Sequence, residues 1–283
     1  MRDVARQRLG QHFLASAAWR ERIARLVLGV GAIEAEAEGK IRAAQAASQR
    51  GDLWIEIGAG HGEMTSLLAR QVGRLVAVEL DPKLLPRLRE QTADLPNLEV
   101  IAGDVLALDL AALTGGERFR VYGNLPYYIT SPIVHRLLEH GERLEAAFLV
   151  VQLEVAARMT AHPGSRDYGY FSAFTQFYSK AKVLLRIPPG AFQPPPKVCS
   201  ALVALHLPGE GPQLGIEDET EFMKFLRTCF AQKRKTLRNN LRAAMTQEGA
   251  TALLRECGIG PSARAEELGL AQFARMFAGM RRD

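Results

Sequence analysis

The sequence is poor in cysteine and in long apolar runs. Its 283 residues include three cysteines, Cys199, Cys229 and Cys257, which lie far apart and form no C-x-x-C pair. No paired-histidine pattern is present either, so neither a disulfide framework nor a zinc site is predicted. The apolar stretch from Ile23 to Ile33 is too short and too interrupted for membrane insertion. These absences favour a metal-free protein of the reducing cytoplasm.

The composition is that of a globular protein with an anionic partner. Hydrophobic residues make up 47% of the chain, which is ample for the core of one large domain and a second, smaller one. The formal net charge is +5 and the isoelectric point is near 9.2. A basic balance of this kind favours an anionic partner, although many soluble proteins share it. No internal repeat is visible.

A strand, a glycine turn and a helix follow one another in the first third of the chain. Residues 53–57 form an apolar run typical of a buried strand, and the run breaks at Gly-Ala-Gly-His-Gly over residues 58–62. A helical pattern then covers residues 63–71. Such a turn lets the backbone approach a ligand closely, and the free amides of a helix N-terminus can bind it.

Two carboxylates follow the next two predicted strands. Glu79 ends the apolar run 75–78, and Asp104 follows the run 98–102. Glu79 lies about 20 residues beyond the glycines, the spacing of an acid that binds ribose hydroxyls. The carboxyl ends of parallel strands share one edge of a sheet, so these residues are predicted to meet at a ligand site. Taken separately, Glu79 also fits a solvated strand end and Asp104 a helix N-cap.

A dinucleotide oxidoreductase is the obvious competitor for this pattern. Its fingerprint requires a third small residue for helix packing, and Glu63 occupies that place here. Hydride transfer also leaves Asp104 unexplained. The pattern therefore disfavours NAD and FAD.

The segment Asn124-Leu125-Pro126-Tyr127, after the apolar run 119–122, suggests methyl transfer to an adenine amine. The lone pair of this amine is delocalised into the ring and must be localised before it can attack. The Asn124 side-chain oxygen and a carbonyl before or at Pro126 can accept both amine hydrogens and thereby stabilise a tetrahedral nitrogen. Tyr127 offers a face for an extruded base. Taken alone, these residues also fit an ordinary loop.

Together, the motifs resemble the S-adenosylmethionine-dependent rRNA adenine dimethyltransferases over nearly the whole chain. The resemblance is closer to the KsgA branch, which modifies small-subunit rRNA, than to the Erm branch, which modifies large-subunit rRNA. It rests on Gln11-His12-Phe13-Leu14, Glu56-Ile57-Gly58-Ala59-Gly60, Glu79, Gly103-Asp104, Asn124-Leu125-Pro126-Tyr127, Phe192-Gln193-Pro194-Pro195-Pro196-Lys197-Val198 and the segment 230–241.

The resemblance implies an α/β fold. We expect a Rossmann-like, seven-stranded, mostly parallel methyltransferase sheet whose last strand is antiparallel, followed by a small all-α domain. The breaker cluster Pro-Gly-Glu-Gly-Pro at residues 208–212 places the boundary, with a methyltransferase domain at 1–208 and a helical RNA-binding domain at 209–283. Helical spacing within the latter covers residues 220–230, 233–247, 251–257 and 270–280. Residues 31–50, rich in Ala and Glu, look like a helical insertion.

The resemblance also implies a role for each site residue. His12 and Leu14 would close over the methionine and ribose end of S-adenosylmethionine, Gly58 and Gly60 would give it clearance, and Glu79 and Asp104 would bind its ribose and adenine. Asn124 would lie between the methyl group and the target amine, next to Pro126. The target adenine would stack between Tyr127 and Phe192, although Phe192 alone reads as a core aromatic. His12 stands where many members carry Asn.

The predicted partner is small-subunit (16S) rRNA in the pre-30S particle, with two methyl groups on each of two adjacent adenines near the 3′ end. The basic residues Lys233, Arg234, Lys235 and Arg238, with Arg242, are the candidates for contact with the rRNA backbone, and a solvated helix face is the alternative. Arg158, Arg166 and Lys197 are weaker candidates. A non-catalytic RNA-binding role and an enzyme acting on DNA or large-subunit rRNA remain open. We expect a monomer.

Overall fold

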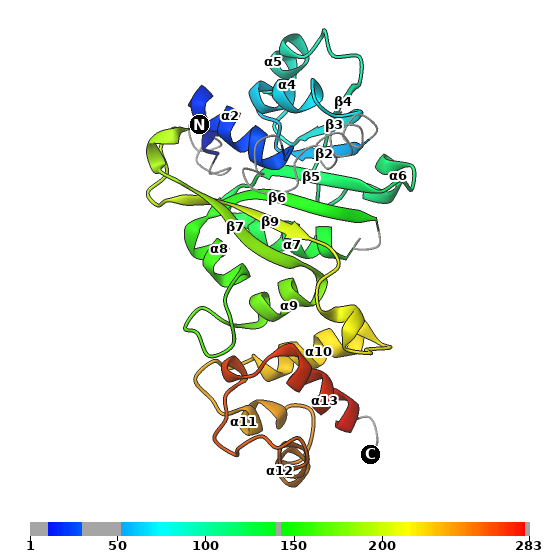
Figure 1. Cartoon of the computed structure of the whole chain (residues 1–283), viewed down its shortest axis with the longest axis vertical. Helices are drawn as coiled ribbons and strands as arrows, with labels where there is room; N and C mark the ends of the chain where they lie inside the picture. Colours follow the sequence, from blue (N-terminus) through cyan, green and yellow to red (C-terminus); the bar gives the residue numbers. More distant parts are fainter. Residues whose placement is uncertain (1–10, 30–51, 140–142, 281–283) are drawn as a thin grey trace, which may run out of the picture. The chain divides into compact units, whose positions relative to one another are not determined.

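The computed structural model describes residues 11–29, 52–139 and 143–280, and its chain forms two compact units (Figure 1). The first unit combines residues 1–156 with 182–207, and the second combines 157–181 with 208–283. The predicted insertion at 31–50 lies outside the described residues. Within the described part, no helix is long and apolar enough to cross a membrane.

The first unit is built on a sheet to which the described residues contribute seven strands, in the order β4-β3-β2-β5-β6-β9-β7. Strands β2 to β6 pair in parallel, and β9 is antiparallel to β6. This topology confirms the predicted methyltransferase sheet. The bounds are β2 (Leu53–Ile57), β3 (Arg74–Glu79), β4 (Leu98–Ala102), β5 (Phe119–Asn124), β6 (Leu144–Gln152), β7 (Lys180–Ile187) and β9 (Ser200–His206).

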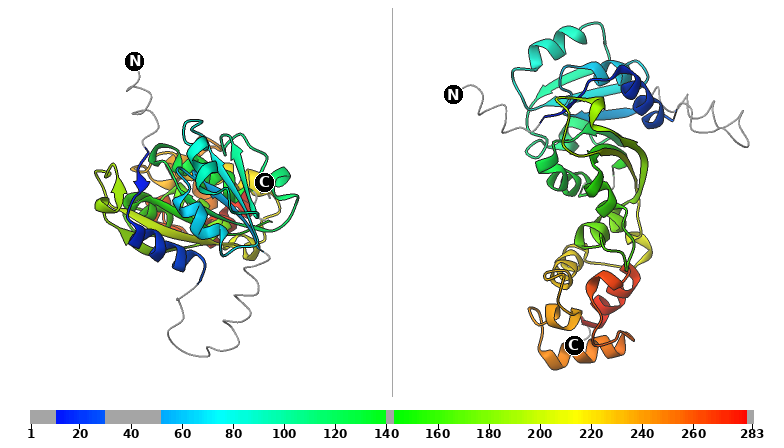
Figure 2. Two further views of the ribbon diagram at one scale, coloured as in Figure 1. Left: turned by 90° about the horizontal axis from the view of Figure 1, so that it is seen from above. Right: turned by 90° about the vertical axis from the view of Figure 1, so that its left-hand side faces the viewer.

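Helices lie against this sheet (Figure 2). All five residues of the central strand β2 are buried, which explains why its sequence is almost continuously apolar. Trp54, Tyr122 and Phe148 join residues of α2 and α4 in one hydrophobic cluster, and burial of such large side chains dominates the stability of a core. The helices of this unit include α2 (Ala17–Val27), α4 (Glu63–Ala69), α5 (Leu85–Gln91), α6 (Leu110–Thr114) and α7 (Thr130–Leu138), and α8 (Leu153–Met159) begins in it and continues into the second unit.

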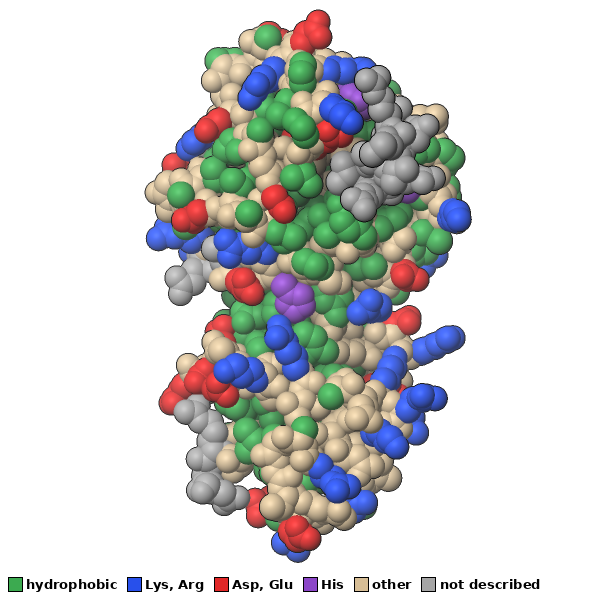
Figure 3. Space-filling model, turned by 180° about the vertical axis from the view of Figure 1, so that it is seen from behind, with side chains coloured by type: hydrophobic (Ala, Val, Ile, Leu, Met, Phe, Trp, Pro, Cys, Tyr) green, Lys and Arg blue, Asp and Glu red, His purple; other side chains and the backbone are tan. Residues whose placement is uncertain are grey.

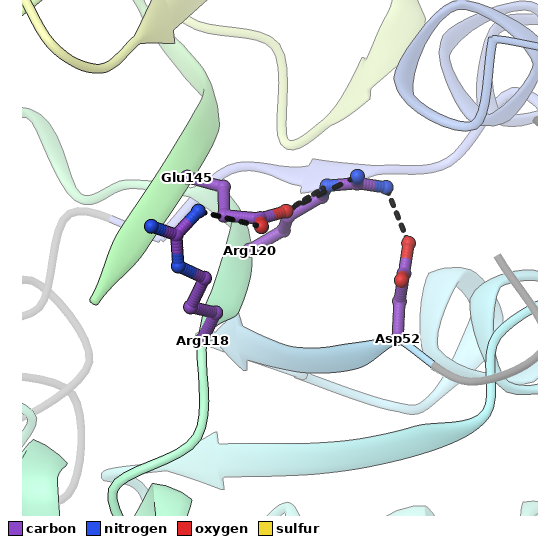
Figure 4. A network of polar contacts seen from close by, with 4 residues as sticks. All are labelled: Asp52, Arg118, Arg120 and Glu145. Carbon is purple, nitrogen blue, oxygen red and sulfur yellow. Dashed lines mark hydrogen bonds and ion pairs between the residues drawn. The ribbon is translucent and has the colours of Figure 1, made fainter. Parts of the chain in front are cut away.

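An ion-pair network ties together the amino ends of three strands (Figure 4). Arg120 of β5 pairs with Asp52 before β2 at 2.5 Å and with Glu145 of β6 at 3.2 Å. Arg118 adds a longer contact of 3.7 Å to Glu145. The Arg120 guanidinium also lies 5.8 Å from the ring centroid of Trp54. Because Arg120 is mostly buried and paired twice, the network contributes more than an isolated surface pair and aligns β2, β5 and β6.

The second unit is helical and has an aromatic core. Its helices are α9 (Tyr170–Tyr178), α10 (Glu219–Cys229), α11 (Leu237–Leu241), α12 (Gln247–Glu256) and α13 (Leu270–Met280). The Phe222 ring lies 5.4 Å from the Phe177 ring of α9 and 5.4 Å from the Phe277 ring of α13. Because of these contacts, residues 157–181 belong to the same unit as the C-terminal helices. The boundary predicted at residue 208 had assigned residues 157–181 to the first domain.

The helix predicted over residues 233–247 is wrong in length. Within that range α11 covers only Leu237–Leu241, and α12 begins at Gln247. The side chain of Thr236 accepts a hydrogen bond from the Asn239 amide and starts α11, and Thr246 does the same for Gly249 at the start of α12. The stretch with helical apolar spacing is therefore divided into two helices by two N-caps that lie ten residues apart, Thr236 and Thr246.

Candidate active site at the carboxyl ends of the strands

One pocket lies at the carboxyl ends of strands β2 to β5. Its wall includes eight of the residues that the sequence motifs singled out: His12, Gly58, Gly60, Glu79, Asp104, Asn124, Pro126 and Tyr127. These residues come from distant parts of the chain, and the parallel register of the strands brings them to one edge of the sheet. The predicted residues therefore line one pocket at a single edge of the sheet.

The glycine turn between β2 and α4 has a left-handed backbone at three positions. The φ angles of Gly58, Gly60 and Gly62 are +75°, +61° and +94°. L-residues rarely adopt this conformation, which accounts for glycine at each place. A Cβ atom on Gly60 would also lie 3.2 Å from the Phe13 ring. The turn therefore has little tolerance for side chains beside the pocket.

Glu79 is a buried acceptor for two backbone amides. One carboxylate oxygen accepts a hydrogen bond from the Gly60 amide at 2.7 Å, and the other accepts one from the Asp81 amide at 2.8 Å. The alternative of a solvated strand end is therefore excluded. Each carboxylate oxygen has a further lone pair, so the oriented group can still accept hydrogen bonds from a diol in the pocket.

Asp104 is exposed at the end of β4 and organises the turn that follows. Its Oδ1 accepts a hydrogen bond from the Leu106 amide at 2.9 Å, and its carbonyl accepts one from the Ala107 amide at 2.9 Å. The helix N-cap considered from the sequence is wrong, because Asp109 caps the next helix, α6, and the turn leaves the second carboxylate oxygen of Asp104 for a ligand. Such an oxygen can accept a hydrogen bond from an exocyclic amine.

The Asn124 side chain is held in one orientation by the backbone. Its Nδ2 donates to the carbonyl oxygen of His12 at 2.9 Å. A carbonyl can only accept, so the amide nitrogen must face His12, which leaves Oδ1 as the acceptor of this side chain. The Pro126 carbonyl accepts hydrogen bonds from Ile129 and Thr130, both at 3.2 Å, whereas the Leu125 carbonyl accepts none from the described residues.

A short N-terminal segment, residues 12–14, supports this arrangement and is called the strap below. Strand β1 (Phe13–Leu14) pairs antiparallel with β8 (Phe192–Gln193). The Nδ1 atom of His12 donates to the Pro194 carbonyl at 2.8 Å, and the His12 ring lies 5.4 Å from the Tyr127 ring. His12 therefore positions Asn124 through its carbonyl and anchors the strap through its ring. The sequence pattern did not reveal either contact.

The aromatic residues at the pocket differ from those predicted. Tyr127 is half-buried, and its hydroxyl lies 2.7 Å from Ser200 Oγ. Burial raises the pKa of this hydroxyl, which keeps it protonated, although the Ser200 hydrogen bond opposes the shift. Phe192 is 3% exposed, belongs to the hydrophobic core with Leu14, and is not part of the pocket wall. Phe13 and the 54% exposed Tyr128 line the pocket instead.

Phe13 and Tyr128 line the pocket but were not predicted from the sequence, and the alternation of side chains along a strand could have revealed Phe13. Successive side chains of a strand point to opposite sides, so Phe13 faces the pocket when Leu14 is buried. Tyr128 follows Tyr127 directly in the sequence, so a second aromatic ring beside the predicted one was also visible there. It had been given no role, although both rings line the pocket. In the described part of the chain, no group of three or more His, Cys, Asp or Glu residues has the arrangement of a metal site.

Comparison with known proteins identifies the family of this chain. The family model described as ribosomal RNA adenine dimethylase matches residues 2–281. The chain belongs to this family. The ribosomal RNA small subunit methyltransferase A of Acidobacterium capsulatum is 48% identical over 225 residues, which cover 79% of each chain. The same-named protein of Xanthomonas campestris is 38% identical over 273 residues, 96% of this chain and 95% of its own.

Solved structures of related proteins agree with this adenine dimethylase fold. The crystal structure of the 23S rRNA methyltransferase ErmE has a TM-score of 0.68 at 25% identity, and the match covers 94% of this chain and 98% of that one. A dimethyladenosine transferase from Plasmodium falciparum has a TM-score of 0.73 at 22% identity, covers 96% and 98%, and shows the fold alone. The predicted family and its cofactor, S-adenosylmethionine, are confirmed.

The residues of the pocket fit this cofactor of the adenine dimethylases. Glu79 has two carboxylate oxygens, oriented by backbone amides, that could accept hydrogen bonds from a diol, and Asp104 has an oxygen available for an amine. The left-handed glycine turn keeps side chains away from the space beside them. An adenosine group requires acceptors of both kinds next to an open backbone turn. The bound cofactor supplies a methyl group on a sulfonium, which is an excellent leaving group.

Glu56 is a buried acid of β2 that lies two residues before the glycine turn of this dimethylase. Its side chain is 1% exposed, and one carboxyl oxygen has no hydrogen-bond partner. Burial, with smaller contributions from the nearby Glu79 and Glu63, raises the pKa of Glu56 from 4.5 to about 8, although Thr65 opposes the shift. Glu56 is therefore protonated at neutral pH, so the buried group costs no isolated charge there.

We expect Glu56→Gln to flatten the pH dependence of folding stability. The pKa of Glu56 rises from 4.5 to about 8 on folding, so its contribution is fully present below pH 4.5 and is lost as the pH rises toward 8. Stability should fall by about 1.4 kcal/mol per pH unit within this window. Urea unfolding at several pH values measures the slope. The exposed control Glu90→Gln should keep it, and an unchanged slope in Glu56→Gln would contradict the assignment.

Proposed function

We propose that this protein transfers two methyl groups from S-adenosylmethionine to the N6 amine of each of two adjacent adenines near the 3′ end of small-subunit rRNA. The fixed orientation of Asn124 carries the proposal, because it leaves Oδ1 as an acceptor on the wall of the pocket that Glu79 and Asp104 also line. Family membership supports the reaction, and the relatives named small-subunit methyltransferase A support the choice of subunit.

Asn124 and Leu125 would activate the target amine. Asn124 Oδ1 would accept one amine hydrogen, and the Leu125 carbonyl, which no described residue occupies, would accept the other. Two acceptors outside the plane of the base favour the tetrahedral nitrogen that forms as the methyl group arrives. Holding the reacting atoms in line supplies several kcal/mol, on the order of 7 to 11 for a well-aligned pair. No metal or strong base is part of this proposal.

The target adenine would stack on Tyr127. The Ser200 and His12 contacts hold this ring at the pocket wall. A second face at Phe192 requires that ring to leave the core, where it packs with Leu14. Tyr128 offers an exposed aromatic face without such a movement. Each base–aromatic stack is worth about 1–3 kcal/mol, so either assignment can be tested by alanine substitution.

Transfer of a labelled methyl group tests the proposed substrate. The protein is incubated with labelled S-adenosylmethionine and purified small subunits, large subunits or duplex DNA, and the products are digested to nucleosides. We expect label in N6,N6-dimethyladenosine of the small-subunit rRNA. Label in the large subunit or in DNA would assign a different substrate, and no label in any substrate would favour the non-catalytic alternative.

Exposed cations of the second unit would contact the rRNA backbone. Lys233, Arg234 and Lys235 are exposed at the start of α11, and Arg238 is half-buried within it. Figure 3 shows Lys and Arg side chains spread over the visible face of this unit. Such positively charged surfaces bind phosphates through release of counterions. The partner would be the pre-30S particle in the cytoplasm, and the protein would act as a monomer.

We expect the triple variant Lys233→Gln, Arg234→Gln, Lys235→Gln to weaken the salt dependence of rRNA binding. Each lost phosphate contact reduces the log–log slope by about 0.7 for single-stranded RNA, so three contacts amount to about 2. Filter binding at several salt concentrations measures this slope. The control Arg22→Gln, Arg25→Gln, Arg70→Gln removes the same charge from the first unit and should keep the slope. Equal slopes for both variants would show that Lys233, Arg234 and Lys235 make no phosphate contacts and form only a solvated helix face.

A further inference from the structure

Ser200 is a buried residue at the start of β9 whose hydroxyl contacts Tyr127. Its Oγ lies 2.7 Å from Tyr127 Oη, and within the described chain neither hydroxyl has another hydrogen-bond partner. Ser200 is 0% exposed and is not part of the pocket wall, so it has no surface for a substrate. Any effect of this side chain on methyl transfer must therefore pass through Tyr127.

The backbone around Ser200 is fixed by the sheet. Ser200 pairs with Gln152 of β6, and the Leu153 amide donates to the Cys199 carbonyl at 2.9 Å. The Ser200 hydroxyl is therefore a stationary anchor, and a hydrogen bond to it limits movement of the half-buried Tyr127 ring.

The two methyl transfers of the proposed function differ in the number of hydrogen bonds that hold the amine. In each transfer the nitrogen lone pair forms a bond to the methyl carbon, the carbon–sulfur bond breaks with its electrons on sulfur, and one N–H proton passes to water. The adenine amine begins with two hydrogens for Asn124 Oδ1 and the Leu125 carbonyl. The monomethylated amine has one hydrogen, so one of these acceptors loses its partner.

Stacking on Tyr127 must then replace part of the lost orientation. Before the first transfer, two hydrogen bonds and the ring restrain the base together, so a loosened ring removes one of several redundant restraints. Before the second transfer, one hydrogen bond and the ring remain, and the same loosening misaligns the nitrogen with the methyl group. Restraints that act together are not additive, and a misplacement of about 1 Å costs on the order of a hundredfold in rate.

We propose that Ser200 is a positioning residue for the second methyl transfer. It acts through the Tyr127 ring, and the inference rests on the proposed function, in which both transfers occur in this pocket. Loss of the Ser200 hydroxyl slows the second transfer more than the first. N6-methyladenosine then accumulates where the unchanged protein yields N6,N6-dimethyladenosine.

A single-turnover time course tests this role. Excess protein is mixed with saturating S-adenosylmethionine and purified small subunits, and nucleoside analysis follows N6-methyladenosine and N6,N6-dimethyladenosine. We expect Ser200→Ala to lower the ratio of the second rate constant to the first about tenfold. Tyr127→Phe keeps the ring and removes the same hydrogen bond from the other side, so it should lower the ratio equally. The double variant should lower it no further.

Ser179→Ala is the matched control for loss of a buried serine hydroxyl. Ser179 is 1% exposed and donates to the Thr175 carbonyl at 2.9 Å, in the second unit. The control should keep the wild-type ratio of rate constants. Circular dichroism and thermal unfolding measure the fold and stability of every variant, because a merely structural role of Ser200 would lower stability without changing the ratio.

A wild-type ratio in Ser200→Ala and Tyr127→Phe would overturn the proposal, and so would equal slowing of both transfers or additive losses in the double variant. If Ser200→Ala does not fold, Tyr127→Phe decides alone. A wild-type protein that makes no dimethyladenosine in small subunits would refute the proposed function and this inference with it. Dimethylation with unaltered ratios in the variants would refute only the role of Ser200.

Discussion

Asn124→Ala is expected to reduce methyl transfer to background, a loss of at least about a hundredfold, with only a modest loss of cofactor affinity. The substitution removes the acceptor that the His12 carbonyl orients toward the pocket. Losing one preorganised group that acts on the developing transition state typically costs a factor of 10² to 10³. Single-turnover methyl transfer to small subunits measures the rate, and calorimetry measures cofactor binding.

A matched variant separates this effect from loss of stability. Asn97→Ala removes an amide that donates to the carbonyls of Ala69 and Val72 at 2.8 and 3.0 Å, away from the pocket. It should destabilise the first unit by about 1–3 kcal/mol and leave the methyl-transfer rate of the folded protein unchanged. An Asn124→Ala protein that methylates RNA at a rate near wild type would refute the proposed activation of the amine.

Glu79→Gln is expected to raise the dissociation constant of S-adenosylmethionine by roughly 10- to 100-fold. The carboxylate accepts the amides of Gly60 and Asp81 and is proposed to bind the ribose hydroxyls. Glutamine has a single acceptor oxygen, so one of the two amides must face an NH₂ group instead. Hydrogen bonds to charged groups are worth about 1.5–3 kcal/mol each. Calorimetric titration with S-adenosylmethionine measures the affinity.

The rate at saturating cofactor should change less than the affinity in this variant. Among the described residues, no hydrogen bond links Glu79 with Asn124, the residue proposed to bind the amine. Glu99→Gln is the control, because Glu99 pairs with Arg74 at 3.1 Å on the neighbouring strand and faces solvent. Unchanged cofactor affinity in Glu79→Gln would remove this residue from the binding site.

The sequence by itself indicated the family, through the resemblance of its motifs, and also several strands and most of the pocket. The strands and the pocket depend on local rules: apolar runs form buried strands, glycine permits left-handed turns, and a polar residue after a parallel strand lies at the ligand edge. Residues 53–57 and 98–102 match β2 and β4 residue for residue, and Glu79 and Asp104 lie at the pocket where the strand pattern placed them. None of these inferences requires knowledge of a contact between distant side chains.

Only the tertiary structure decided how the side chains of the pocket are oriented. The bond from Asn124 to the His12 carbonyl joins residues 112 positions apart, and the pairing of β1 with β8 buries Phe192 behind Leu14. The orientation of Asn240 likewise depends on the Cys229 carbonyl, 11 positions away, which accepts a hydrogen bond from its Nδ2. Orientation depends on which partner occupies each donor and acceptor, and that competition is settled only when distant segments meet.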